Sequence, residues 1–189
     1  MRISARTVAP ADLRALLPWA TVADDGVVTA EVRDREFTQR CLEMSNAVDA
    51  AEGRPVLKYD ENSTTVDIAA PADEVFESLI DRERFEQWFG LPLAIELYAG
   101  GRWEIEGGGP VGTVVEVVAD RRLVLAERTG VSTWELSEVD EGTRLSVTMV
   151  LDGGPPPPRS WCGWLSGINQ LRRLHEVPDR CPIWVPEQG

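Results

Sequence analysis

Two side chains in this sequence have the acid–base chemistry expected of a catalytic group. Glu116 is the one polar residue in the run VVEVV, and strand alternation places it on one face with Val114 and Val118. On an apolar inner face its carboxyl group would have a raised pKa and would suit a general acid or base. If that face is the outer one, Val115 and Val117 line the core instead and Glu116 is solvated.

His175 is the only histidine, and histidine is the side chain whose charge changes most readily near neutral pH. It follows Leu171 by four residues on the apolar face of a predicted helix. It also lies at the end of that helix, where a cation merely favours the helix dipole. No carboxylate that would orient the imidazole is evident from the sequence, so a structural role is favoured over a catalytic one.

Tryptophans form the second chemical feature, because their rings bury large areas and their N–H groups can bind a ligand. Tryptophans that line a cavity would favour an aromatic or fused-ring ligand, whereas tryptophans that merely fill space would close the core. Both alternatives stay open from the sequence. The residues expected to contact a ligand are Trp88, Trp103, Trp134, Met149, Trp161, Trp164, Leu165 and Ile168.

Neither a metal site nor a cofactor site is predicted. Cys41, Cys162 and Cys181 are far apart and form no CxxC pair, so they indicate neither a disulfide framework nor a zinc site. The sequence has no P-loop, GxGxxG or GxSxG spacing. Cys162 flanks Trp161 and, with no cation to lower its pKa, is expected to be inert.

The net charge of -13 argues against nucleic acid and against anionic membrane surfaces as partners. No apolar run approaches the roughly 20 residues that a membrane helix needs. The N-terminus lacks the apolar centre and cleavage site of a signal peptide. These observations predict a cytoplasmic protein that takes a small molecule, with a second copy of the chain as the alternative partner.

The first 58 residues are expected to form a mostly helical extension. ADLRALL (11–17) predicts a short helix, GVVTAEV (26–32) a short strand, and DREFTQRCLEMSNAVDAAEG (34–53) a longer helix. In the longer helix an apolar stripe requires burial against the rest of the chain or a second subunit. That stripe comprises Phe37, Cys41, Met44 and Val48. A polar connection then leads to a domain spanning residues 59–189.

From residue 63 the pattern predicts a strand, two short helices, six strands and a long helix. STTVDIAA (63–70) alternates as a strand does, and two helical segments follow Pro71 and Asp81. The next strands are expected at 93–99, 102–107, 112–119, 122–128, 132–139 and 143–151. Their turn-like separators indicate an antiparallel meander.

The C-terminal helix is expected between residues 159 and 177, after four consecutive prolines. Its apolar residues recur at helical spacing and form one stripe. Arg172 and Arg173 near its end suit the negative end of the helix dipole. We therefore expect this helix to lie across a curved antiparallel sheet and to cover its apolar face.

Five segments in this order resemble a known family. They are VDIAAPADEVFESLIDRERFEQWFG, AGGRWEIEG, GTVVEVVADRRLVLAER, STWELSEVDEGTRLSVTMVLDG and WCGWLSGINQLRRLHE, within residues 63–176. Together they resemble the START/Bet v 1-like (SRPBCC) superfamily, in the branch similar to the C-terminal domain of the Hsp90 ATPase activator. The resemblance implies an α+β helix-grip fold, in which a curved antiparallel sheet wraps around the long C-terminal helix. It further implies a cavity that often takes an apolar or amphipathic small molecule.

Three functions follow as hypotheses, because fold and function must be argued separately. The favoured one is binding of a small apolar or aromatic molecule between the sheet and the C-terminal helix. The alternative is an enzyme similar to a polyketide cyclase, which positions its substrate and uses Glu116 or His175 to move a proton. The third is a module that binds a protein partner, as a co-chaperone does.

Overall fold

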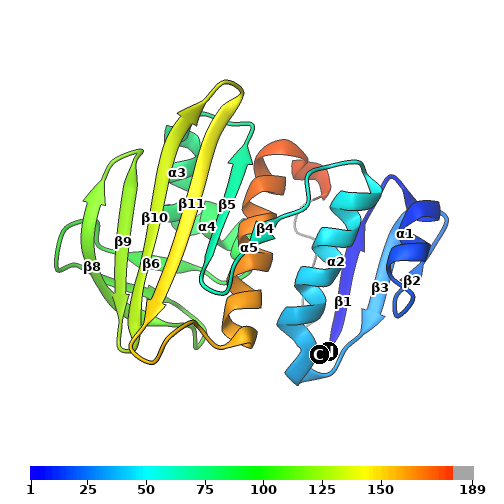
Figure 1. The fold of residues 1–189 in the computed structure, drawn as a ribbon, viewed down its shortest axis with the longest axis horizontal. Coiled ribbons are helices and arrows are strands. Elements are labelled where there is room, and N and C mark those ends of the chain that lie inside the picture. The colour runs from blue at the N-terminus through cyan, green and yellow to red at the C-terminus, as the bar shows by residue number, and fades with distance from the viewer. Residues whose placement is uncertain (181–189) are drawn as a thin grey trace. The chain divides into compact units, whose positions relative to one another are not determined.

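The computed structural model describes residues 1–180 of the chain (Figure 1). Internal contacts group the chain into two compact units. One unit joins residues 1–57 to the segment that begins at Pro158, and the other spans Lys58–Pro157. The C-terminal helix therefore groups with the N-terminal residues, whereas the sequence assigns it to a domain of residues 59–189.

The unit of residues 58–157 is built on an eight-stranded sheet with the order β4-β5-β11-β10-β9-β8-β7-β6. The strands are β4 (Lys58–Tyr59), β5 (Ser63–Ile68), β6 (Leu93–Ile95), β7 (Arg102–Ile105), β8 (Val111–Val118), β9 (Arg122–Glu127), β10 (Gly130–Val139) and β11 (Gly142–Leu151). All neighbours are antiparallel, and short turns join β6 through β11 in chain order. The predicted antiparallel meander is confirmed.

One face of this sheet is apolar, because large side chains alternate with polar ones along the strands. In β11, Leu145, Val147 and Met149 are buried while Arg144 and Thr148 are exposed. Residues paired by the strand registers share a face of the sheet, so the partners of these three residues in the neighbouring strands, and so on across the sheet, lie on this face as well. We call it the apolar face; its buried apolar residues are Val66, Ile68, Leu93, Trp103, Ile105, Val114, Leu123, Leu125, Trp134, Leu136, Leu145, Val147 and Met149.

Two short helices, α3 (Ala72–Ile80) and α4 (Arg82–Phe89), connect β5 to β6. The Asp81 side chain caps α4 by accepting a hydrogen bond of 2.9 Å from the Arg84 amide. Gly90 ends α4 in a left-handed conformation (φ 84°), which glycine adopts without steric cost. α3 contacts β10 and β11, so the helix pair belongs to the same unit as the sheet.

The expectation of a mostly helical N-terminal extension is wrong, since residues 1–57 also contain a three-stranded antiparallel sheet. Its strands β1 (Arg2–Arg6), β2 (Thr21–Val22) and β3 (Val27–Glu31) have the order β1-β3-β2. The helices beside it are α1 (Pro10–Leu16), the 3₁₀ turn η1 (Asp34–Glu36) and α2 (Phe37–Ala51). β1 buries only Ile3 and Ala5, which is too short an alternation to stand out in the sequence.

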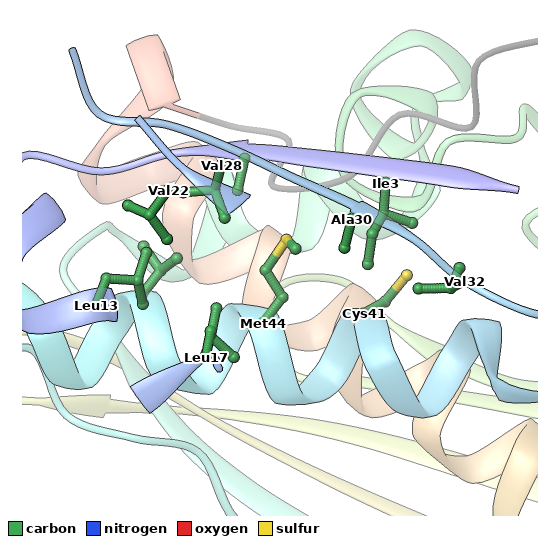
Figure 2. Close-up of a cluster of buried hydrophobic side chains, with 11 residues drawn as sticks. Ile3, Leu13, Leu17, Val22, Val28, Ala30, Val32, Cys41 and Met44 are labelled. Carbon is green, nitrogen blue, oxygen red and sulfur yellow. The ribbon is translucent and has the colours of Figure 1, made fainter. Parts of the chain in front are cut away.

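The apolar stripe of α2 is buried within the N-terminal residues themselves. Cys41, Met44 and Val48 belong to a cluster whose other members all lie between residues 3 and 32, and Phe37 packs against it. Figure 2 shows Met44 and Cys41 directed from α2 toward side chains of the small sheet. The stripe therefore requires neither the rest of the chain nor a second subunit to cover it.

A different side of α2 packs against the C-terminal helix α5 (Pro158–Glu176), which is followed by the 3₁₀ turn η2 (Pro178–Arg180). The Asn169 amide donates hydrogen bonds to the Ser45 hydroxyl and to the Asn46 side chain, at 3.1 Å and 3.2 Å. The buried Asp49 carboxylate lies 2.6 Å from guanidinium nitrogens of both Arg172 and Arg173. This contact between the two helices is polar and charged.

Arg172 and Arg173, which the sequence linked only to the helix dipole, are thus buried in an ion-pair contact. Their side chains are 3% and 0% exposed, and both are paired with Asp49 of α2. The predicted apolar stripe of α5 is also buried, apart from Leu174 and His175, which are half-buried. Burial extends around the helix, since Asn169, Gln170 and Ser166 are buried as well.

The α+β class, the antiparallel sheet and the long C-terminal helix of the helix-grip fold are confirmed. None of the helices within residues 1–180 has the length and apolar composition needed to span a membrane.

Candidate functional site

The apolar face of the large sheet brings together three of the residues predicted to contact a ligand: Trp103, Trp134 and Met149. All three side chains are nearly inaccessible, at 1–3% exposure. The Trp103 Nε1 donates to the Ala126 carbonyl oxygen at 3.1 Å, and the Trp134 Nε1 donates to the Ser132 hydroxyl at 3.1 Å. Because the sheet itself uses both N–H groups, the two indoles contribute apolar ring surface to this face.

The position of the Trp103 indole depends on a glycine in the adjacent strand. Gly112 is the register partner of Trp103, and a Cβ at this position would lie 2.8 Å from Trp103 Nε1 and 1.8 Å from the Ala126 carbonyl oxygen. The missing side chain therefore lets the indole lie across β8 and reach Ala126 in β9.

Trp88 lies apart from this face, in α4. It is fully buried, and its Nε1 donates to the Ser78 carbonyl oxygen of α3 at 2.8 Å. Its ring makes an edge-on contact with Phe85 at 4.6 Å between centroids and with Phe89 at 5.6 Å. This arrangement holds α3 and α4 together.

The remaining predicted ligand contacts all lie on α5, in the other unit. They are Trp161, Trp164, Leu165 and Ile168, and each is buried. The structure thus separates the predicted residues into a sheet group, a helix group and Trp88.

Glu116 is solvated, as in the second of the two alternatives that the sequence left open, but Val114 is buried and Val115 is exposed, which neither alternative foresaw. A β-bulge at Val115 changes the register, so that Val114 faces Leu125 but Glu116 faces Val124. The Glu116 side chain is 48% exposed and pairs with Arg122 at 3.0 Å. Because the bulge moves it out of the row of Val114, it lacks the enclosure that would make it a general acid or base.

His175 is half-buried near the end of α5 and belongs to the unit of residues 1–57 and α5. Burial raises the pKa of the Cys41 thiol to about 12, and burial together with the charge of Glu43 raises the pKa of Cys162. Both thiols are therefore protonated at neutral pH and poor nucleophiles. Cys181 lies outside the described residues.

Glu127 is a candidate that the sequence analysis overlooked. It is half-buried at the end of β9, and alternation with Leu123 and Leu125 places it on the apolar face. Burial alone raises the pKa of Glu127, and within residues 1–180 its carboxyl group has no hydrogen-bond or ion-pair partner. The signal in the sequence is weak, because Val124 and Ala126 are apolar too and RLVLAE shows no clear alternation. Within the same residues, no group of three or more side chains is arranged to bind a metal ion.

Comparisons with known proteins agree with this architecture. Residues 69–175, more than half of the chain, match the family model described as "Activator of Hsp90 ATPase homolog 1-like protein". No curated protein matches the chain significantly.

Three solved structures illustrate the similarity. A conserved protein of unknown function from Enterococcus faecalis is 22% identical, with a TM-score of 0.56 over 77% of this chain and 87% of that one. DynU16, titled a putative protein in the dynemicin biosynthetic locus, is 28% identical, with a TM-score of 0.53 over 65% of this chain and 50% of that one. The Aha1 dimer from Colwellia psychrerythraea is 15% identical, with a TM-score of 0.52 over 61% of this chain and 96% of that one.

Proposed function

Because the chain belongs to the family of activator of Hsp90 ATPase homolog 1-like proteins, we propose that it binds a small apolar or aromatic molecule on the apolar face of its sheet. The observation that carries the proposal is the pair of indoles, Trp103 and Trp134, whose N–H groups are already bonded to the sheet. Rings of this kind offer flat apolar contacts, and these suit an aromatic ligand better than a polar one. The proposed site therefore lies on the sheet, within the unit of residues 58–157.

The enzymatic alternative has less support. Glu116 is exposed and paired with Arg122, so the chemistry that made it a catalytic candidate is missing. Cys41 and Cys162 have raised pKa values and are unsuited to nucleophilic catalysis. Binding, which needs shape and apolar surface but no matched acid–base pair, accounts better for the residues on the apolar face. A cytoplasmic location and association into a homodimer both stay predictions.

Calorimetric titration with 2-methoxynaphthalene, an apolar aromatic probe, tests the proposal. We expect the wild-type protein to bind the probe and Trp103→Phe to bind it about three- to tenfold more weakly, because a smaller ring replaces the indole. Trp19→Phe is the matched control, since Trp19 belongs to the N-terminal unit, where the Arg40 guanidinium lies over its ring. A wild-type protein that binds no aromatic probe, or equal weakening by both variants, would contradict the proposal.

A further inference from the structure

Glu127 occupies an unusual place in the large sheet, because glycine flanks it on both sides. Its register partners are Gly112 in β8 and Gly130 in β10. No side chain therefore arises directly beside the Glu127 carboxyl group on either neighbouring strand. The next positions in the same row are Trp103 in β7 and Leu151 in β11.

The side chains of Trp103 and Leu151 occupy the space above Gly112 and Gly130, where a Cβ atom would otherwise lie. A Cβ on Gly112 would collide with the Trp103 indole, and a Cβ on Gly130 would lie 2.3 Å from the Leu151 Cδ2. Glu127 thus lies between an indole that covers one glycine and a leucine that covers the other. The result is one carboxyl group with apolar walls on both sides, at the β9–β10 hairpin end of the apolar face.

The charge on this face is concentrated at that end. Among the strand residues whose register places them on the apolar face, only Glu127 and Glu138 are charged. Glu138 is exposed and lies at the opposite end of β10, beside the turn to β11. Glu127 is the half-buried one, and its neighbours on this face within β8, β9 and β10 are Val114, Leu125, Ser132 and the two glycines, none of them charged.

We propose that Glu127 is the polar anchor of the ligand site and that the ligand is an aromatic ring bearing a hydroxyl group, which donates a hydrogen bond to this carboxylate. The inference rests on the proposed function and adds the chemical class of its ligand. The hydroxyl group supplies the hydrogen bond that the Glu127 carboxylate lacks within residues 1–180. An anionic ring is disfavoured, because its charge would repel the carboxylate.

Burial of the carboxyl group agrees with this role. It raises the pKa of Glu127, because the charged form is less well solvated at this half-buried position than in water. A donor that approaches such a carboxylate makes a charge-assisted hydrogen bond, which is stronger than a hydrogen bond between neutral groups. A ring of the same size without a donor would gain only the apolar contacts.

Three naphthalene probes distinguish these contributions by calorimetry at pH 7: 2-naphthol, 2-methoxynaphthalene and 2-naphthoate. For Glu127→Gln we expect about tenfold weaker binding of 2-naphthol, because the charged acceptor is lost. Binding of 2-methoxynaphthalene should change less than about twofold, and 2-naphthoate should bind more tightly once the repulsion is removed. Glu138→Gln, on the same face but exposed at its other end, is the matched control and should leave all three affinities unchanged.

A second variant, Glu127→Leu, removes both hydrogen-bonding groups that the glutamine amide would still offer to the probe. Circular dichroism and thermal melting verify that both variants are folded. If the probes bind the wild-type protein but Glu127→Gln and Glu127→Leu weaken 2-naphthol no more than its methyl ether, the inference is overturned and the proposed function stands. If no probe binds the wild-type protein, the proposed function fails and the inference falls with it. Selective loss of 2-naphthol in both variants supports the inference.

Discussion

Asp49 is a carboxylate with 0% side-chain exposure, held between two helices that are more than a hundred residues apart in the sequence. It accepts hydrogen bonds from Arg172 and Arg173 of α5 at 2.6 Å each, and from Arg54 at 3.2 Å. Arg54 also pairs with Glu176, and Arg173 lies 3.7 Å from Glu52. Three carboxylates therefore balance three guanidinium groups, which is the condition under which buried charge is tolerated.

Replacing Asp49 with asparagine should lower the free energy of unfolding by about 3–5 kcal/mol, because Arg172 and Arg173 would keep their charges with too little compensation. Urea denaturation measures the loss. Asp67→Asn is the matched control: Asp67 pairs with Arg144 at 2.7 Å, but its side chain is 55% exposed, so the loss should stay below about 1 kcal/mol. Similar losses in the two variants would show that the buried pairs contribute no more than a surface pair.

At the scale of elements, alternation and turn residues were sufficient to predict most of the large sheet. TRLSVTMV alternates along its whole length, and β11 buries the alternate residues Leu145, Val147 and Met149. The bulge at Val115 could not be predicted, because an extra residue in one strand depends on the register with its neighbour and leaves no local signature. That single residue decides on which face Glu116 lies.

The candidate site was predicted less well than the fold. Trp103, Trp134 and Met149 do share one face, whereas Trp88 belongs to the contact between α3 and α4. The ion pairs of Arg172 and Arg173 could not be predicted, because helical periodicity shows which residues share a side but not which residue lies opposite. Their partner, Asp49, is revealed only when α2 and α5 are brought together.

Two glycine-to-alanine substitutions test how closely the elements approach each other. Gly112→Ala should destabilise the protein by about 1–3 kcal/mol or more, because the new methyl group would lie 1.8 Å from the Ala126 carbonyl oxygen. Gly163→Ala in α5 should instead stabilise it by up to about 1 kcal/mol, since a Cβ there meets only the Thr38 methyl group at 3.4 Å and alanine favours the helix. Thermal unfolding compares the two; a Gly112→Ala variant as stable as the wild-type protein would contradict the close approach at Gly112.

At the scale of the whole molecule, the family match and the compact units divide the chain differently. The match covers residues 69–175 and so includes both the large sheet and α5. The contacts assign α5 to the unit of residues 1–57, where α2 supplies Asp49, Ser45 and Asn46 as its hydrogen-bonding partners. The N-terminal residues are therefore part of the structure that holds the family's characteristic helix.

Removing residues 1–57 should consequently destabilise the remaining chain. Arg172 and Arg173 would lose the carboxylate that balances them, and the side of α5 that contacts α2 would be uncovered. We expect residues 58–189 to melt at a lower temperature than the full chain, or to aggregate, as seen by thermal unfolding and size-exclusion chromatography. An equally stable, monodisperse fragment would show instead that residues 59–189 form an independent domain, as the sequence predicts.

The pairing of α2 with α5 also constrains the order in which the protein can fold during its synthesis on the ribosome. α2 leaves the exit tunnel early, together with the small sheet that buries its apolar stripe. The Arg172 side chain that Asp49 requires lies 123 residues further along, so the whole eight-stranded sheet must be synthesised before the two can meet. Until then Arg54 is the one of its three arginine partners that has been synthesised, and we expect the burial of Asp49 to be a late event of folding. We therefore expect the N-terminal residues to complete their packing only after α5 has left the ribosome.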